Sequence, residues 1–364
     1  MKHSQSKPIL AIDTSCDDTS AAVTLGQYVL SNVIASQTEL HKQYGGVFPT
    51  VAKQAHKENI AATVAAALKK AQVTWKKLVA IAVTQGPGLA PALEVGIVYA
   101  QKVSQQYSLP LIPINHLEGH LLSVLAKPKP QGTNWQELSG ELPDNKNSLG
   151  IIISGGHSMF VKVNKIGKYK VLGETLDDAA GECLDKVGRM LNLGYPAGPI
   201  IEEFSKRGNP KAIAFPLPLT TTKTYDLSYS GLKTAARILL EEKDGIKVLQ
   251  KQQLYDFCAS IQYAVFRHIC YKLDKLLQAQ EFSSVWLGGG VAANSELRRM
   301  IRETIKANSK QVQNPNLLVP YSKRLCMDNA AMIGVAASGK KGIPSAEIDA
   351  MERKPRWGLG ELKS

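Results

Sequence analysis

The sequence has 364 residues, which is long enough for two domains. Its apolar fraction of 44% suits globular cores, and its apolar runs have only the length of strands, so we expect neither a signal peptide nor a membrane span. The five cysteines form no CxxC pair, which favours reduced thiols in the cytoplasm over a disulfide framework. The net charge of +13 favours contact with a polyanion such as nucleic acid, with simple solubility as the alternative.

Strands and helices alternate through the first part of the chain. Three short strands with tight turns come first, and Pro49 then suits the first turn of an Ala- and Leu-rich helix. A strand, a Gln-Gly-Pro-Gly turn at 85–88, a helix, a strand and a helix follow. The expected strands are residues 9–13, 20–25, 28–36, 79–84 and 111–114, and the expected helices are 49–71, 89–106 and 117–125.

The same pattern starts again after residues 127–148, an aperiodic stretch rich in Pro, Gly, Asn, Lys and Glu that indicates a linker or long loop. Strands at 149–154, 158–163 and 169–172 and a helix at 178–193 repeat the opening order, which indicates an internal duplication of a three-strand and helix unit. Two such units facing each other would form a cleft. The remaining expected elements are a loop region at 215–230, helices at 231–241, 249–280, 293–307 and 328–338, and a strand at 285–287.

His116 and His120 directly follow the strand expected at 111–114. Four residues apart on a helix, they share a face and can bind one metal ion, and ligands commonly bind where strands end in α/β sheets. Two histidines that only cap a core helix are the alternative. A zinc peptidase of the HExxH type is disfavoured, because Glu118 stands two positions after the first histidine and points away from the metal face.

Two glycine turns follow strands of the second half. Residues 288–294 (Gly-Gly-Gly-Val-Ala-Ala-Asn) bring backbone amides close to an anionic or nucleotide ligand, although their spacing matches neither GxGxxG nor a Walker loop. A turn without a ligand is the alternative. Residues 154–157 (Ser-Gly-Gly-His) form the other turn. Acidic side chains gather near one helix start, where some only face the helix dipole: Asp177, Asp178, Glu182 and Asp185.

Residues 12–19 (Ile-Asp-Thr-Ser-Cys-Asp-Asp-Thr) and 41–47 (His-Lys-Gln-Tyr-Gly-Gly-Val) resemble the opening signatures of the universal tRNA threonylcarbamoyladenosine transferase family. Its bacterial form is the TsaD type, formerly called O-sialoglycoprotein endopeptidase. The similarity runs in order through nearly the whole chain. Each motif alone is weak, but this many together are specific. The other similar segments are 86–88, 116–120, 154–157, 177–185, 195–199, 230–234, 288–294, 326–329 and 355–357.

The resemblance implies the α/β, two-lobed fold of actin, Hsp70 and sugar kinases, with duplicated ribonuclease-H-like units and a central cleft. The expected domains are an N-terminal lobe at 1–126, the linker at 127–148, a C-terminal lobe with a helical insertion at 149–340, and a tail at 341–364 that packs back on the N-terminal lobe. The implied activity is metal-assisted acyl transfer in the inter-lobe cleft. The threonylcarbamoyl group moves from threonylcarbamoyl-AMP to the exocyclic amine of the adenosine 3′ of the anticodon, in tRNAs that read codons starting with adenine.

The resemblance also places the site residues and partners. The metal ligands fall on His116, His120 and Asp328, which would hold one Fe²⁺ or Zn²⁺ per subunit. No general base is assigned; His157 is a candidate by position, with a structural role as the alternative. The implied partners are tRNA, a TsaB-type paralogue and a TsaE-type P-loop ATPase, in the cytoplasm and without a membrane. Substrate-binding residues fall on Ile152, Ile153, Ser154, Gly155, Gly156, Asp185, Gly198 and Asn294, with Glu202, Gly289 and Gly290 as further candidates.

The residues alone leave two other classes of protein possible. A sugar or acetate kinase of the same fold would phosphorylate a small metabolite with ATP, but such kinases do not require the histidine pair, which favours the transferase. A non-catalytic scaffold subunit would lack some of the metal ligands, and this chain keeps all three. The sequence departs from the family's pattern at Thr50, Gln54, Pro91, Glu94 and Ala330.

Overall fold

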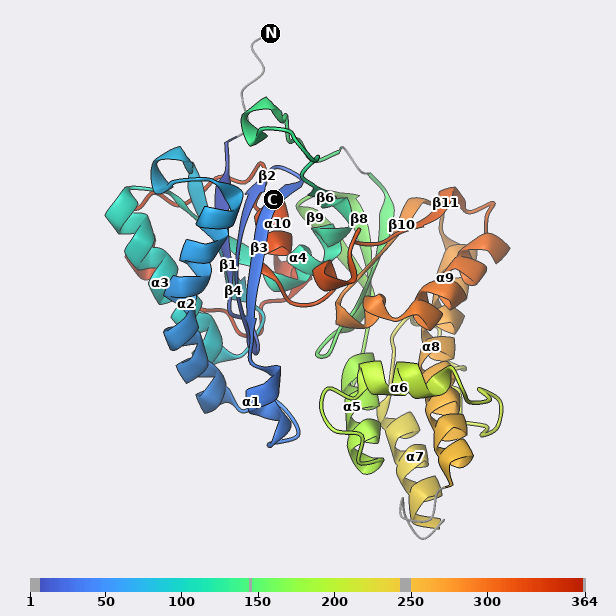
Figure 1. The fold of residues 1–364 in the computed structure, drawn as a ribbon. Coiled ribbons are helices and arrows are strands. Elements are labelled where there is room, and N and C mark those ends of the chain that lie inside the picture. Colours follow the sequence, from blue (N-terminus) through green and yellow to red (C-terminus); the bar gives the residue numbers. More distant parts are fainter. Residues whose placement is uncertain (1–6, 144–145, 243–249, 363–364) are drawn as a thin grey trace. The chain divides into compact units, whose positions relative to one another are not determined.

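The chain folds around two mixed β-sheets, each in its own unit (Figure 1). The computed structural model describes residues 7–143, 146–242 and 250–362. The first unit comprises Met1–Asp144 and Pro320–Lys363, and the second comprises Asn145–Val319. None of the helices in these described ranges combines the length and the apolar composition that crossing a membrane requires.

The sheet of the first unit has the strand order β5-β4-β1-β2-β3-β6. Strands β1, β2 and β3 pair antiparallel as a meander, whereas β4, β5 and the short β6 join by parallel pairing. The strands are β1 Ile9–Asp13, β2 Asp18–Leu25, β3 Tyr28–Ser36, β4 Ala80–Gly86, β5 Leu111–Asn115 and β6 Lys127–Pro128.

The sheet of the second unit has the order β11-β10-β7-β8-β9. Its pairing repeats that of the first unit, with an antiparallel meander β7-β8-β9 and parallel β10 and β11. The predicted internal duplication is therefore confirmed. The strands are β7 Ser148–Ile153, β8 Ser158–Lys165, β9 Lys168–Glu174, β10 Phe282–Gly288 and β11 Val312–Leu318.

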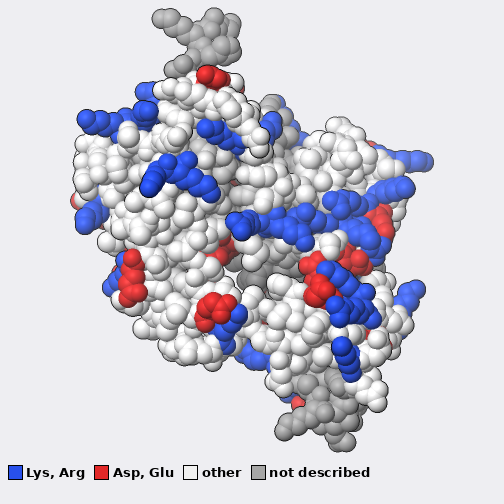
Figure 2. Space-filling view, in the orientation of Figure 1, with Lys and Arg blue, Asp and Glu red and all other residues white. Residues whose placement is uncertain are grey.

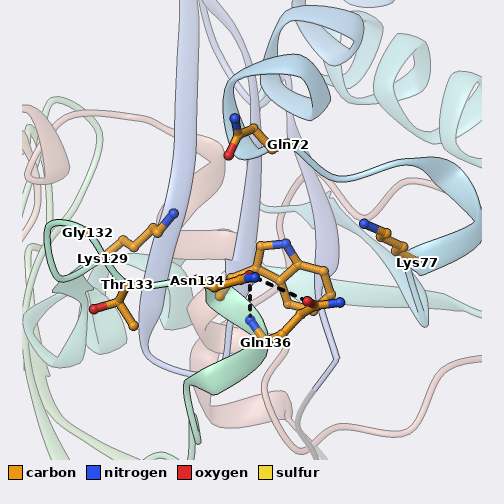
Figure 3. A pocket seen from close by; sticks show the side chains of 8 residues that line it. Gln72, Lys77, Lys129, Gly132, Thr133, Asn134 and Gln136 are labelled. Atoms are coloured by element: carbon orange, nitrogen blue, oxygen red, sulfur yellow. Dashed lines mark hydrogen bonds between the residues drawn. The ribbon is translucent and has the colours of Figure 1, made fainter.

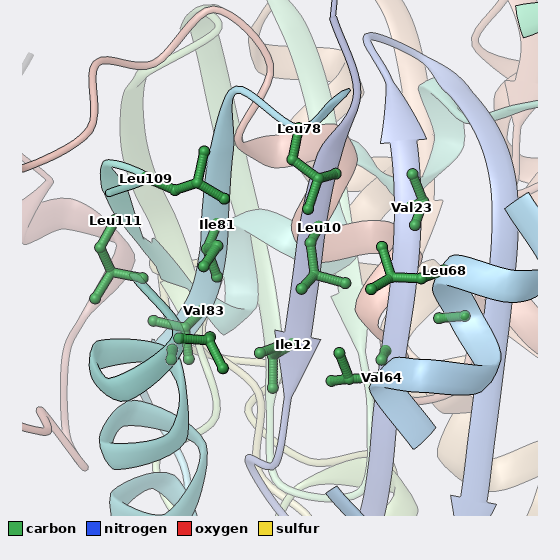
Figure 4. Close-up of a cluster of buried hydrophobic side chains, with 14 of the residues drawn as sticks. Leu10, Ile12, Val23, Val64, Leu68, Leu78, Ile81, Val83, Leu109 and Leu111 are labelled. Carbon is green, nitrogen blue, oxygen red and sulfur yellow. The ribbon is translucent and has the colours of Figure 1, made fainter. Parts of the chain in front are cut away.

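Side chains on the two faces of the first sheet differ in size. Leu10 and Ile12 of β1 belong to a buried apolar cluster with side chains of α2 (Pro49–Ala71) and α3 (Ala90–Tyr107) (Figure 4). Ala11, between them in the sequence, lies on the other face because successive strand residues alternate. Its neighbours across the sheet are Ala22 and Ala82. These small residues leave room for a helix close to the sheet.

That helix is α10 (Ala330–Ala336), all of whose residues are buried. A Cβ on Gly334 would lie 2.5 Å from Oγ1 of Thr24, so the close approach of α10 to β2 requires glycine there. The second unit thus ends at Val319, not at the predicted boundary of 340. The physical reason is that a helix as apolar as α10 needs a covered surface on all sides, and the Ala face of the first sheet provides one.

The C-terminal segment of the chain forms backbone hydrogen bonds with β4 and β5 of the first sheet. Leu111 of β5 and Ile343 exchange backbone hydrogen bonds of 2.9 and 2.8 Å, and the amide of Lys354 donates to the carbonyl of Gln85 at 2.8 Å. A Cβ on Gly86 would lie 1.8 Å from the carbonyl oxygen of Lys354, which explains the glycine that ends β4. Residues up to Asp144 of the expected linker also belong to this unit. There Gly26 and Gly140 approach too closely for any side chain.

Each unit contains one helix that was not predicted from the sequence: α1 in the first unit and α6 in the second. Residue 249, the expected start of the helix at 249–280, lies outside the described residues. The further helices are α1 Thr38–Lys42, α4 His116–Leu122, α5 Ala180–Met190, α6 Gly198–Ser205, α7 Ser230–Glu242, α8 Lys251–Ala279 and α9 Ser295–Ala307. Short 3-10 helices are η1 Trp75–Lys77, η2 Ser123–Leu125, η3 Trp135–Glu137, η5 Gly290–Ala293, η6 Lys323–Leu325, η7 Ile348–Ala350 and η8 Leu359–Glu361.

Candidate functional site

The two histidines lie on α4, which begins where β5 ends. Asn115 is the N-cap of this helix: its side-chain oxygen accepts hydrogen bonds from the amides of Leu117 (2.9 Å) and Glu118 (3.3 Å). An amide N-cap satisfies backbone donors that a helix start otherwise leaves free. The start of α4 is thereby fixed to the end of a buried strand, which sets the positions of His116 and His120.

The three predicted metal ligands come together in the first unit. Nε2 of His116 lies 3.4 Å and Nε2 of His120 lies 3.2 Å from the same atom, Oδ1 of Asp328. A tetrahedral Zn²⁺ with bonds of about 2.0–2.1 Å separates its ligand atoms by about 3.3 Å, which is close to both of these distances. The three ligand atoms all lie within 4.8 Å of one another. The arrangement is a possible His-His-Asp metal site.

Burial differs among the three side chains. His120 is fully buried and His116 nearly so, whereas the side chain of Asp328 is 28% exposed. A metal held by these residues would therefore be reached from the side of Asp328. Three protein ligands with one accessible side are typical of catalytic sites, whereas structural zinc sites are closed by four protein ligands.

Asp13, at the end of β1, lies behind His116. It is buried, and its Oδ1 accepts a hydrogen bond from the amide of Ser15 (3.1 Å). Its Oδ2 lies 3.8 Å from Nδ1 of His116, and neither atom has a hydrogen-bond partner among the described residues. A carboxylate on the far nitrogen of a ligating histidine orients the ring and raises its basicity. Asp13 was not predicted as a site residue, although it ends a buried strand and belongs to the similar segment 12–19.

Charges around this cluster shift its protonation. Burial alone would lower the pKa of His116, but the carboxylates of Asp328 and Asp13 together outweigh burial and raise it to about 9. Burial opposes ionisation of Asp328, yet His116 holds the Asp328 pKa well below its usual range. Burial also lowers the pKa of His120, and it raises that of Asp18, the first residue of β2, to about 6. Without a metal, His116 therefore carries the proton of the cluster at neutral pH.

Gly119 sets the distance between α4 and α10. A Cβ at this position would lie 2.9 Å from Cδ1 of Ile333 and 3.2 Å from Cγ of Met332. Asp328 precedes α10 by two residues, and the side chain of Asn329 caps that helix by accepting from the amide of Met332 at 3.2 Å. Close packing at Gly119 thus brings the third ligand to the two histidines.

Glu118 takes no part in the metal cluster. Its side chain is fully buried and forms an ion pair with Nζ of Lys340. A general base of a zinc peptidase must reach the water on the metal. The buried pairing of Glu118 with a lysine therefore argues against peptidase chemistry.

The predicted substrate residues all belong to the second unit. Ile152 and Ile153 end β7, and the following turn is closed by a hydrogen bond from the amide of Ser154 to the carbonyl of His157 (2.8 Å). A Cβ on Gly155 or Gly156 would meet no atom within 4 Å. Packing therefore does not require these two glycines, and their bare backbone leaves room for a ligand to approach. The backbone of His157 closes the turn, since its carbonyl accepts from Ser154 and its amide donates to Oγ of Ser154 at 3.1 Å.

The second glycine turn lies against the first. Gly289 has a φ of +92°, and a Cβ there would lie 2.4 Å from the carbonyl oxygen of Ile153. Gly290 begins η5, after which Asn294 caps α9 by accepting from the amides of Glu296 (2.9 Å) and Leu297 (3.2 Å). The side-chain amide of Asn294 also donates to Gln262 of α8 at 2.8 Å. Its side chain thus holds the turn in place.

Two carboxylates hold the neighbouring segment. Oδ1 of Asp185 accepts hydrogen bonds from the amides of Ala197 (2.8 Å) and Gly198 (3.2 Å), where α6 begins. Oε1 of Glu202 accepts from the amide of Ser295 (2.9 Å), the first residue of α9. The side chains of Asp185 and Glu202 thus fix the starts of α6 and α9.

A cavity of about 480 Å³ in the first unit contains none of the predicted site residues. Its lining includes Gln72, Lys77 and Lys129, which Figure 3 labels, and Nζ of Lys77 lies 5.7 Å from the ring centroid of Trp135. These residues adjoin β6, which pairs with the start of β3, whereas the histidine cluster adjoins the carboxyl ends of β1 and β5. The cavity is thus separate from the metal cluster. Lys and Arg are also spread widely over the face seen in Figure 2, among smaller groups of Asp and Glu.

Comparison with known proteins identifies the family. A model of the family described as TsaD, tRNA N6-adenosine threonylcarbamoyltransferase, matches residues 28–335. The chain belongs to this family. The tRNA N6-adenosine threonylcarbamoyltransferase of Endomicrobium trichonymphae is 43% identical over 356 residues, covering 96% of this chain and 97% of that protein. The protein of the same description from Syntrophotalea carbinolica is 41% identical over 355 residues, covering 97% of both chains.

Membership of the threonylcarbamoyltransferase family makes the chain a transferase. Component A of the (R)-2-hydroxyglutaryl-CoA dehydratase of Acidaminococcus fermentans superposes with a TM-score of 0.51 at 13% identity, covering 94% of this chain and 99% of that one. At that identity the likeness concerns the fold alone. The predicted fold class, that of actin, Hsp70 and sugar kinases, is confirmed.

Proposed function

We propose that the chain transfers the threonylcarbamoyl group of threonylcarbamoyl-AMP to tRNA. The acceptor is the exocyclic amine of the adenosine 3′ of the anticodon, in tRNAs that read codons starting with adenine. The amine nitrogen forms a bond to the carbamoyl carbon, the bond from that carbon to the phosphate oxygen breaks, and AMP leaves. The observation that carries the proposal is the convergence of His116, His120 and Asp328 on one point with an accessible side, in a chain of this family.

His116, His120 and Asp328 would hold one Fe²⁺ or Zn²⁺, because two imidazoles and a carboxylate suit either ion. When bound, such an ion supplies a Lewis acid that polarises the carbamoyl carbonyl or holds the threonyl carboxylate. Asp13 would keep His116 in the orientation that presents Nε2, since its carboxylate lies toward the opposite ring nitrogen. Proximity then contributes much of the rate, because the acyl-adenylate is already activated.

The glycine turns of the second unit would bind the adenylate. Ser154, Gly155 and Gly156 present backbone next to open space, which suits donation to a phosphate or a developing oxyanion. Ile152 and Ile153 position this turn at the end of β7. Gly289 and Gly290 would allow the nucleotide to approach the backbone of the second turn.

The polar residues of the predicted substrate set would act mainly by holding these turns. Asp185 fixes the backbone of Gly198, Glu202 fixes the start of α9, and Asn294 caps that helix. We propose tRNA, a TsaB-type paralogue and a TsaE-type ATPase as partners. The net charge of +13 supports the tRNA among them.

The test compares Asp328→Asn with Asp349→Asn, an exposed carboxylate of η7 outside the metal cluster. Each variant replaces the wild type in cells, and threonylcarbamoyladenosine is measured in their tRNA by nucleoside mass spectrometry. We expect loss of the modified nucleoside and of bound metal in Asp328→Asn and neither loss in Asp349→Asn. Full modification by a metal-free Asp328→Asn protein would refute the metal role. Undiminished modification in cells lacking the chain would refute the function.

A further inference from the structure

Side chains of α8 and α9, with Pro210, Lys211 and Leu217, line an open cavity of about 790 Å³ in the second unit. This volume lies in the range of about 300–1,000 Å³ that small-molecule sites occupy. None of the predicted substrate residues lines it. The lining combines aromatic, aliphatic and charged side chains: Pro210, Lys211, Leu217, Tyr263, Arg267, Cys270, Tyr271, Glu296, Arg299, Met300, Glu303 and Thr304.

Arg267 lacks a partner in this cavity. Its Nε is buried without a hydrogen bond, and its guanidinium forms no ion pair with any described residue. A buried donor left without an acceptor lowers the stability of the fold, so an acceptor supplied by a ligand would be favoured at this position. Tyr263 and Tyr271 stand one helical turn before and after Arg267 on α8, so they share a helix face with it, and all three residues line the cavity.

The acids of the cavity are committed elsewhere. Glu296 and Glu303 both form ion pairs with Arg299, the first at 2.6 Å. The charge of Arg267 is therefore not neutralised by them, and Lys211 adds a second cation at the cavity. A guanidinium fork binds a carboxylate or a phosphate through two parallel hydrogen bonds, which is the acceptor that Arg267 lacks.

We propose that this cavity binds a small aromatic oxyanion, with its carboxylate or phosphate on Arg267 and its ring against Tyr263. Leu217 and Met300 supply apolar surface for the ring. Phosphate monoesters and carboxylates share this chemistry. The site goes beyond the proposed transfer reaction, because it uses no residue assigned to the metal or to the adenylate.

The binding test uses the full chain with phenyl phosphate and benzoate as probes. Phenol and inorganic phosphate are the half-ligands of phenyl phosphate, benzene and formate are those of benzoate, and isothermal titration calorimetry gives the affinities. We expect one of the two probes to bind at least tenfold more tightly than its halves, and the tighter probe identifies the anionic group. Arg267→Met should weaken that probe at least tenfold. Arg302→Met, which removes an exposed arginine of α9 outside the cavity, should leave it unchanged.

The stability of the ligand-free variants separates a binding role from a structural one. Because Nε of Arg267 has no partner, Arg267→Met should unfold at the same temperature as the wild type or higher, while the rise in Tm caused by the probe is lost. Arg267→Lys keeps the charge without the fork and should bind the probe several-fold more weakly than the wild type. Binding of neither probe, equal binding by wild type and Arg267→Met, or a ligand-free Arg267→Met that unfolds many degrees lower would each overturn the proposal. We expect Arg267→Met to modify tRNA as the wild type does. Failure of the cavity proposal would then leave the proposed transferase function unaffected.

Discussion

The side-chain amide of Asn115 donates a hydrogen bond to the backbone carbonyl of Trp357 at 3.0 Å. The oxygen of the same amide caps α4, the helix of His116 and His120. One side chain therefore joins the C-terminal segment to the metal-ligand helix. The Pro-Arg-Trp motif at 355–357, which the sequence offered only as a family signature, has a structural role at this point.

Asn115→Ala removes both contacts of this amide. We expect a loss of stability of about 1–2 kcal/mol, since losing an N-cap costs about 0.5–2 kcal/mol, together with weaker metal binding because the start of α4 is no longer fixed. Urea unfolding and metal titration measure the two effects. Asn134→Ala, which removes the cap of the exposed η3, serves as the control and should leave metal affinity unchanged. Equal metal affinity in both variants would show that Asn115 does not fix the start of α4 for metal binding.

A larger side chain at Gly119 should separate α10 from α4. The first atoms that a new Cβ meets belong to the flexible ends of Ile333 and Met332, so Gly119→Ala should be accommodated. Gly119→Val should cost about 1–3 kcal/mol as an overpacked core and displace Asp328 from the histidines. Thermal unfolding of the purified variants measures the loss of stability, and their metal content measures the displacement of Asp328. Normal metal content in a folded Gly119→Val protein would show that the spacing of α4 and α10 does not control the site.

Metal binding should release a proton from His116. Its pKa of about 9 in the metal-free protein means that the imidazole is charged at pH 7, and a ligating imidazole must be neutral. Between about pH 7 and pH 9 we therefore expect the apparent metal affinity to rise about tenfold per pH unit, and to level off above pH 9. Calorimetry in buffers of different ionisation enthalpy counts the protons. Release of no proton at pH 7 would mean that Asp328 does not hold His116 in its charged form.

The Glu118–Lys340 pair should show unequal costs when either partner is removed. Lys340→Met leaves a carboxylate that is fully buried without its cation, and we expect a loss of about 2–3 kcal/mol, below the full cost of a broken buried pair because Lys340 is partly exposed. Glu118→Gln leaves a lysine that can reach water, so it should cost about 1–2 kcal/mol. Denaturant unfolding measures both. Transferase activity per folded molecule should persist in Glu118→Gln, whereas a collapse of activity without loss of stability would make Glu118 a participant in the chemistry.

Local signals in the sequence predicted most elements of the fold. The helix expected at 49–71 has the observed bounds Pro49–Ala71, because a proline in the first turn and a long Ala- and Leu-rich stretch agree with each other. Strand β11 was not predicted, because its central residues Gln313 to Asn316 are exposed and polar and include Pro315. Such a composition is typical of an edge strand, which has no alternating apolar pattern. Helix α6 was hidden by the prolines of the 195–199 segment.

The candidate site was predictable only in part. The spacing of His116 and His120 was enough to place both on one helical face. Nothing local marks Asp328 as their partner, because a contact between residues so far apart in the chain depends on packing at Gly119 and Gly334. Only the resemblance to the family supplied it. The same absence of a local signal explains the misplaced boundary at 340, since the apolar character of α10 predicts a buried helix but not the sheet that buries it.

The division of the first unit between Met1–Asp144 and Pro320–Lys363 has a consequence for synthesis. A growing chain emerges from the ribosome with its N-terminal end first, and domains generally fold as they emerge. The first sheet is made early, but the helix that covers its alanine face is made only after the whole of the second unit. Until then the sheet exposes an apolar surface and the histidines lack their carboxylate. The metal site can therefore form only after Asp328 has been synthesised. A protein truncated before Pro320 should not bind the ion and should aggregate.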